Sequence, residues 1–138
     1  MVYVTRKGLI DNNFTQAAGE AFDVLCAYMK KHHLMGAIQT WLGITPDEES
    51  MVGPENARYM AGAILARGKK IEREGEIDVQ VIPAGRWVVF IHKGPYETMW
   101  QTWQAAYRDW LPFSREEARD APPYKAYLRD KHRYERKT

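Results

Sequence analysis

VVFIHKG, residues 88–94, repeats the pattern of VYVTRKG, residues 2–8, because both are strand patterns led by apolar residues and ending in Lys-Gly. A helical pattern rich in aromatic residues follows each stretch, and a third apolar segment follows each helical pattern. Two copies of a small unit tend to pack together, because neither copy buries its apolar surface alone. The chain is therefore predicted to be one domain of two repeats, about 1–66 and about 77–138, with a ligand cleft between them.

Hydrophobic periodicity predicts where the helices and strands lie. One amphipathic helix is predicted from Phe14 to about Lys31 and a second from Trp100 to Leu111. The predicted strands are at 2–7, 38–44, 58–66, 77–81, 86–92 and 124–128. The first repeat has no counterpart of the predicted strand 77–81, and the second repeat has no counterpart of the predicted strand 58–66. One strand is thus missing at each end of the duplicated pattern. We expect either a trimmed unit or a partner that supplies these strands by edge pairing, as in a homodimer.

The composition predicts the class of protein and excludes several partners. The 138 residues are 45% hydrophobic and carry a formal net charge of +2, so nothing calls for a nucleic-acid partner. The single cysteine, Cys26, excludes an intrachain disulfide and fits a reducing compartment. No apolar run approaches the ~20 residues of a membrane span. The sequence thus predicts a soluble cytoplasmic protein that contacts neither membrane nor nucleic acid.

A set of motifs in the second half resembles the GyrI-like small-molecule-binding domain. The motifs are His92-Lys93-Gly94-Pro95-Tyr96-Glu97, Trp103, Trp110-Leu111-Pro112 with Ser114, and Pro123-Tyr124-Lys125-Ala126-Tyr127-Leu128. The first half is similar to the same domain through Val2–Gly8, Phe22 with Leu25, and Arg58-Tyr59. This domain is also the effector-binding module of many AraC- and MerR-type transcription regulators.

The resemblance implies an α+β fold. This fold is a pseudo-twofold duplicated strand–helix–strand–strand unit, with an antiparallel sheet, two long helices on one side and a ligand cleft between the repeats. Members bind aromatic, often cationic, compounds, and a few stand-alone relatives hydrolyse reactive cyclopropane-containing natural products. The chain departs from the family pattern because it lacks the first and last strands and a helix-turn-helix. Lys125 also stands where the family usually places an acidic residue facing the cleft, which argues against a preference for cations.

The candidate ligand-binding residues combine aromatic side chains, which suit flat ligands, with two cationic side chains. They are Trp41, Tyr59, Tyr96, Trp103, Tyr127, Arg58 and Lys125. Each cation has an alternative role: Lys125 either extends outward into solvent or points into the cleft, where it would favour anionic or carbonyl-bearing ligands. Arg58 would hold either a ligand anion or a neighbouring carboxylate. Trp103 belongs to a helical stripe that would equally pack on the sheet.

Motifs for catalysis, cofactors and metals are missing from the sequence. It has no Ser–His–Asp or Cys–His arrangement, no phosphate loop, no dinucleotide fingerprint and no spacing of metal ligands, so neither cofactor nor metal is predicted. Glu97 and Glu20 are the remaining candidates for acid–base chemistry, and the place of Glu97 at a helix start equally suits capping. The sequence therefore favours a chain without catalytic activity.

The leading functional hypothesis is non-catalytic binding of a small aromatic or hydrophobic ligand. The chain would act as the effector-sensing domain of a transcription regulator, or as a stand-alone drug- or metabolite-binding protein. One alternative is an enzyme that hydrolyses reactive cyclopropane-type natural products. Another is a protein-interaction or inhibitor module, for which exposed strand edges would provide the contact.

Overall fold

The computed structural model describes residues 1–11, 13–47, 49–82, 87–95, 98–118 and 123–127. The described residues form two compact units. The first unit comprises those within 1–82 together with 123–127, and the second comprises those within 87–118. The proposed repeats, about 1–66 and about 77–138, stay a prediction.

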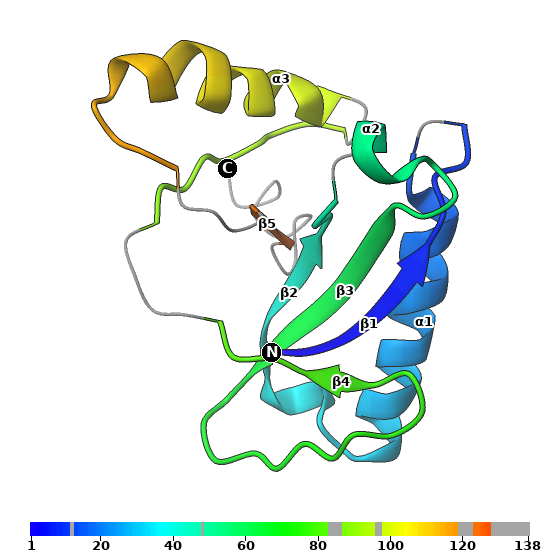
Figure 1. The fold of residues 1–138 in the computed structure, drawn as a ribbon. Helices are drawn as coiled ribbons and strands as arrows, with labels where there is room; N and C mark the ends of the chain where they lie inside the picture. The colour runs from blue at the N-terminus through cyan, green and yellow to red at the C-terminus, as the bar shows by residue number, and fades with distance from the viewer. Residues whose placement is uncertain (12, 48, 83–86, 96–97, 119–122, 128–138) are drawn as a thin grey trace. The chain divides into compact units, whose positions relative to one another are not determined.

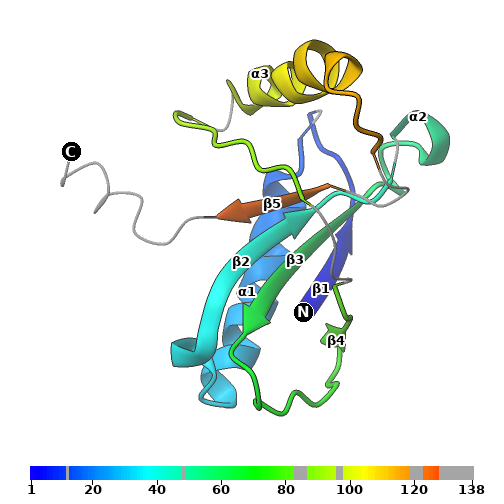
Figure 2. The same cartoon turned by 90° about the vertical axis from the view of Figure 1, so that its left-hand side faces the viewer.

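The first unit contains a five-stranded antiparallel sheet in the order β4-β1-β3-β2-β5. The strands are β1 (Val2–Lys7), β2 (Ile38–Ile44), β3 (Arg58–Leu65), β4 (Asp78–Val79) and β5 (Tyr124–Tyr127). Figure 2 shows β5 alongside β2, far from it in sequence. The predicted α+β class and antiparallel sheet are confirmed, whereas the duplicated unit and two long helices stay predictions.

One long helix, α1 (Thr15–Lys31), covers one face of this sheet (Figure 1). The side chain of Asn13 accepts a hydrogen bond from the backbone N–H of Thr15 at 3.0 Å, which supports the first turn. At the other end His33 has a φ of 57°. The N–H of Leu34 reaches the carbonyl of Met29 at 2.8 Å. These are the marks of a Schellman stop, so α1 ends beside the His32-His33 pair.

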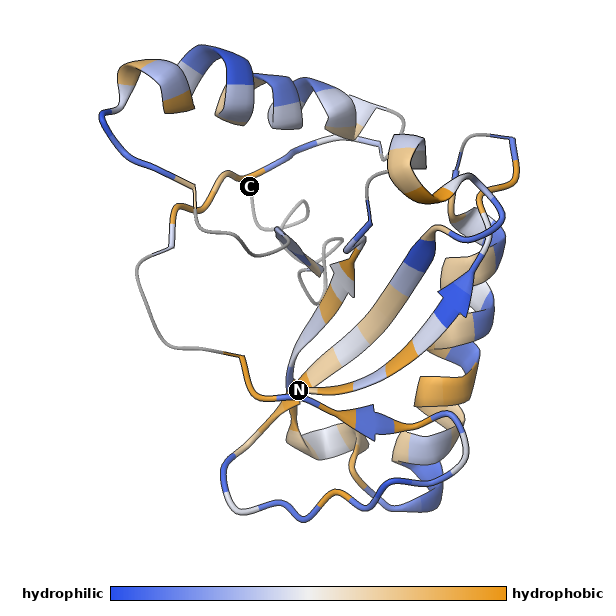
Figure 3. Cartoon of the chain, viewed as in Figure 1, coloured by the Kyte–Doolittle hydropathy of each residue, from blue (hydrophilic) through white to orange (hydrophobic). Residues whose placement is uncertain are grey.

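The core lies between α1 and the sheet. Val2 and Val4 of β1 and Tyr59 of β3 are buried there against Leu25 and Met29 of α1. Burying such side chains contributes about 1.5–3 kcal/mol each to folding. Figure 3 shows the apolar middle of β3 and the hydrophilic adjoining ends of β1 and β3. Lys7 pairs with Arg58 at these ends. Because strand residues alternate, the residues between these core positions project from the opposite face of the sheet.

The second unit is built on one helical stretch. Helix α3 (Met99–Gln104) continues as a π-helical segment, Ala105–Trp110, and a 3-10 turn, Leu111–Phe113. The first unit also has two short elements, the 3-10 turn Met35–Ala37 and α2 (Glu49–Val52).

The strand predicted at 86–92 is wrong over its described part, because residues 87–92 form no strand and residues 88–92 have no ladder partner within the described chain. Phe90 instead packs edge-on against Trp110, with ring centroids 5.6 Å apart. Nδ1 of His92 lies 2.7 Å from the hydroxyl of Thr102. Strand-like sequence alone does not make a strand, because a strand also needs neighbours for its backbone groups.

Candidate functional site

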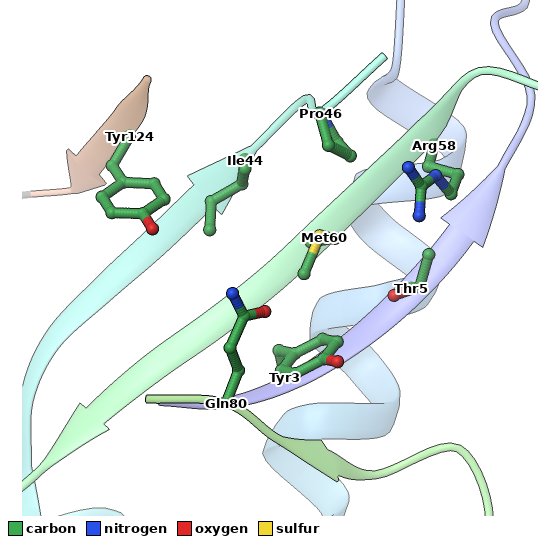
Figure 4. A pocket seen from close by; sticks show the side chains of 8 residues that line it. All are labelled: Tyr3, Thr5, Ile44, Pro46, Arg58, Met60, Gln80 and Tyr124. Atoms are coloured by element: carbon green, nitrogen blue, oxygen red, sulfur yellow. The ribbon is translucent and has the colours of Figure 1, made fainter. Parts of the chain in front are cut away.

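The face of the sheet opposite α1 carries a pocket of about 240 Å³ within the first unit. Figure 4 shows the lining side chains on the near side of the sheet, with α1 behind it. The lining residues are Tyr3, Thr5, Ile44, Pro46, Arg58, Met60, Gln80 and Tyr124. They come from four strands and from positions just beyond β2 and β4, so the pocket exists only in the assembled sheet.

The floor of the pocket is apolar and its rim is polar. Ile44 and Met60 are buried, and their side chains come from the central strands β2 and β3. Thr5, Gln80 and the hydroxyl of Tyr124 add hydrogen-bonding groups around them. An apolar floor with a few polar groups is the usual construction of a small-molecule site.

Arg58, the cation of the pocket, is already paired with a carboxylate. Its Nε and Nη2 donate to the two oxygens of Asp47 at 2.9 and 2.7 Å, and its backbone N–H donates to the same carboxylate at 2.9 Å. These hydrogen bonds hold the pKa of Asp47 below its usual value and raise the pKa of Arg58. The neighbouring-carboxylate alternative is therefore realised, and the pair brings no net charge to the pocket.

A second polar group touches the pocket through Tyr3. The Tyr3 hydroxyl donates to Asp78 at 3.3 Å, and Arg73 lies 2.9 Å from the other oxygen of that carboxylate. Burial and the nearby Asp78 charge raise the pKa of Tyr3, so the phenol stays protonated at neutral pH. Tyr3 is thus a neutral group at the rim.

Four of the residues predicted to bind a ligand gather on the other face of the sheet, beside α1. They are Trp41, Tyr59, Lys125 and Tyr127, and the Phe22 ring of α1 lies 5.9–6.2 Å from the three aromatic rings. The Tyr59 and Tyr127 hydroxyls are 2.8 Å apart. Lys125 Nζ lies 5.4 Å from the centre of the Tyr59 ring. We call these four residues with Phe22 the aromatic–lysine cluster.

The other predicted residues are not in that cluster. Arg58 lines the pocket on the opposite face, and Trp103 lies in the second unit, where it stacks on Tyr107 at 5.9 Å. Tyr96 and Glu97 lie outside the described residues. Glu20 is exposed on α1 and accepts a hydrogen bond from Gln16 at 3.1 Å.

Within the described part of the chain, no three His, Cys, Asp or Glu side chains come together as metal ligands would. The helices described here are all too short or too polar to cross a membrane.

Comparison with known proteins adds one decisive observation. A family model described as the GyrI-like small molecule binding domain matches residues 1–137. The chain belongs to this GyrI-like family. No curated protein and no solved structure matches the chain. The family assignment supports a small ligand as the partner of this GyrI-like domain.

The sequence did not point to most of the pocket of this GyrI-like domain. Tyr3 and Thr5 alternate with the buried Val2 and Val4, so the period-two signal was present for a second face. That signal did not show which strands would lie beside β1. The pairing of β1 with β3 and of β2 with β5 brings the pocket residues together.

Proposed function

We propose that this GyrI-like domain binds a small, uncharged, ring-containing ligand in the pocket on the open face of the sheet. It would do so without catalysis, as the effector-sensing part of a transcription regulator or as a stand-alone drug- or metabolite-binding protein. The observation that carries the proposal is the pocket itself, with a buried apolar floor and a rim whose arginine is already paired.

The size of the pocket limits the ligand. Its volume of about 240 Å³ lies below the range of about 300–1,000 Å³ that accommodates drug-sized molecules. A ligand of one ring or two fused rings is therefore expected. Ile44 and Met60 would pack against the ring, and the rim would accept or donate one or two hydrogen bonds.

The charge of the pocket limits the ligand further. Asp47 neutralises Arg58, so an anionic ligand would have to compete with a bidentate carboxylate. A cationic ligand would meet the Arg58 guanidinium at the rim. A neutral ring neither competes with the Asp47 carboxylate nor brings a positive charge to Arg58. We therefore expect it to bind better than a charged ring of the same size.

Saturation-transfer NMR with indole, benzoate and benzylammonium tests this proposal. Indole is expected to receive saturation from the wild-type chain more strongly than either charged probe. Thr5→Phe, which fills the pocket, should weaken indole binding by roughly tenfold or more, equal to about 1.4 kcal/mol. The matched control is Thr40→Phe on β2, because Thr40 does not line the pocket.

Two outcomes would contradict the proposal. One is the absence of saturation transfer to all three probes at millimolar concentration. The other is equal indole binding by Thr5→Phe and Thr40→Phe, which would place the binding outside the pocket. A preference for benzoate or benzylammonium over indole would reject the uncharged ligand.

A second candidate function, a protein-interaction module, is favoured by one observation. Residues 87–91 of the second unit expose large apolar side chains, with Val89 at 81% and Ile91 at 70% of full exposure. The backbone of residues 88–91 has no ladder partner within the described chain. An extended apolar segment of this kind is suited to edge pairing with a second copy of the chain.

A further inference from the structure

Lys125 is held in an unusual environment for a lysine. It lies on β5 opposite Gly43 of β2, and its side chain is half-buried on the α1 face of the sheet. Its neighbour Tyr124 lines the pocket on the opposite face, so the two side chains serve different sites. Lysine is rarely buried without a partner charge.

The absence of a side chain at Gly43 creates the space beside Lys125. A Cβ at Gly43 would lie 2.7 Å from the Tyr127 hydroxyl oxygen and closer still to that of Tyr59. The two phenols therefore meet above Gly43, directly across the strand pair from Lys125. An amine and a hydrogen-bonded pair of phenols are thus neighbours on one surface.

The burial of Lys125 shifts its amine toward the neutral form. Burial lowers the pKa of the Lys125 amine, and no charged side chain of the described residues counteracts this effect. The contact with the Tyr59 ring is weaker compensation than a carboxylate would be. A larger share of the amine is therefore unprotonated and nucleophilic than in an exposed lysine.

We propose that Lys125 captures small hydrophobic aldehydes as an imine, with the Tyr59–Tyr127 hydroxyl pair moving the proton. The Lys125 nitrogen attacks the carbonyl carbon, forming a C–N bond while the carbonyl π electrons move to oxygen. A proton passes from nitrogen to that oxygen, giving a carbinolamine. Loss of the oxygen as water then leaves the C=N bond, so amine and aldehyde give imine and water.

The surroundings select the kind of aldehyde. Phe22, Trp41 and Tyr59 present apolar rings on the same face as the amine, and these suit a hydrophobic substituent. Lys125 lies on β5, the outer strand of the described sheet, and its side chain is partly exposed. This site goes beyond the proposed pocket and lies on the other face of the sheet.

Reductive trapping of the full chain with benzaldehyde and cyanoborohydride tests the proposal. Intact-mass and peptide mass spectrometry are expected to locate one benzyl group on Lys125, at a rate roughly tenfold above Lys69 or Lys70. Lys125→Met should abolish this early label, whereas the control Lys69→Met should leave it unchanged. Tyr127→Phe should slow labelling while Lys125 remains the labelled residue.

Labelling spread evenly over the lysines would overturn the proposal, as would an unlabelled Lys125. Equal labelling rates in wild type and Tyr127→Phe would show that the tyrosine pair does not transfer the proton. Peptide mass spectrometry of the labelled wild-type chain shows whether Lys125 is the preferred lysine, even if Lys125→Met does not fold. The test is independent of the indole experiment, because Thr5→Phe should leave the Lys125 label intact.

Discussion

At the scale of single residues, Gly43 determines how the aromatic–lysine cluster packs. Tyr59 is 2% exposed, and its hydroxyl meets that of Tyr127 at 2.8 Å in the space that a side chain at position 43 would fill. Only glycine leaves room for both phenols there. Gly43 does not have a positive φ, so glycine is required there by the close approach of side chains and not by the backbone conformation.

Gly43→Ala is therefore expected to lower the free energy of unfolding by about 1–3 kcal/mol, because the added methyl displaces the buried hydroxyls. Urea denaturation with an unchanged m value measures this loss. In the Tyr127→Phe background the loss should be smaller, because one of the crowding hydroxyls is gone. The control Gly36→Ala adds a methyl to open space and should change stability by less than about 0.5 kcal/mol. Equal stability of Gly43→Ala and wild type would disprove the close-packing argument.

At the scale of elements, the segment 87–91 has the sequence of a strand but does not form one. Val89 and Ile91 are mostly exposed, and Phe90 packs against Trp110. The unit that contains it has Ala106 as its one buried hydrophobic residue among those described. Such a segment gains most from pairing with another chain.

We therefore predict that the chain forms dimers through the segment 87–91 as its concentration rises, measured by sedimentation velocity. Val89→Lys should shift the chain to monomer, because a charge would be buried in the paired segment. Val81→Lys is the matched control, since Val81 is 84% exposed and lies outside the segment. A wild-type chain that stays monomeric at high concentration, or equal effects of both substitutions, would reject this interface.

At the scale of the whole molecule, three paired carboxylates join segments that are distant in sequence. Asp47 accepts from Arg58, Glu74 from Lys31 and His32, and Asp78 from Tyr3. The pKa of Asp47 is lowered chiefly by the Arg58 side chain, that of Glu74 by Lys31, and that of Asp78 by the Val79 backbone N–H. All three carboxylates therefore bind protons less readily in the folded chain than in the unfolded chain.

The folded chain is expected to lose stability in acid. Above the unfolded values, 3.8 for aspartate and 4.5 for glutamate, the stabilisation is fully present, and it is lost as pH falls through the lower folded pKa values. Asp47→Asn should cost about 1 kcal/mol or less near pH 7, because Arg58 is partly exposed, and this cost should shrink as pH falls below 3.8 through the lower folded pKa of Asp47. Urea denaturation of wild type and Asp47→Asn at pH 7 and at a series of acid pH values measures this. An Asp47→Asn loss that persists undiminished in acid would contradict the ion-pair explanation.

The sequence by itself determined the local elements and the family. The periodicity of residues 14–31 predicted α1, and apolar or alternating runs predicted the strands at 2–7, 38–44 and 58–66, because these signals are carried by neighbouring residues. The motifs from His92 to Tyr127 were sufficient to recognise the GyrI-like family. The aromatic residues Trp41, Tyr59 and Tyr127 were singled out in advance and do lie together.

Only the tertiary structure decided which faces these residues share. Whether Lys125 extends into solvent or lies over Tyr59 depends on the register of β5 against β2, and the meeting of Thr5 with Met60 in one pocket depends on β1 pairing with β3. The same holds for the segment 87–91, whose sequence is that of a strand but which forms none in the structure. Strand pairing joins residues far apart in the chain, and a shift of one residue would turn each side chain to the other face, so no local pattern contains this information.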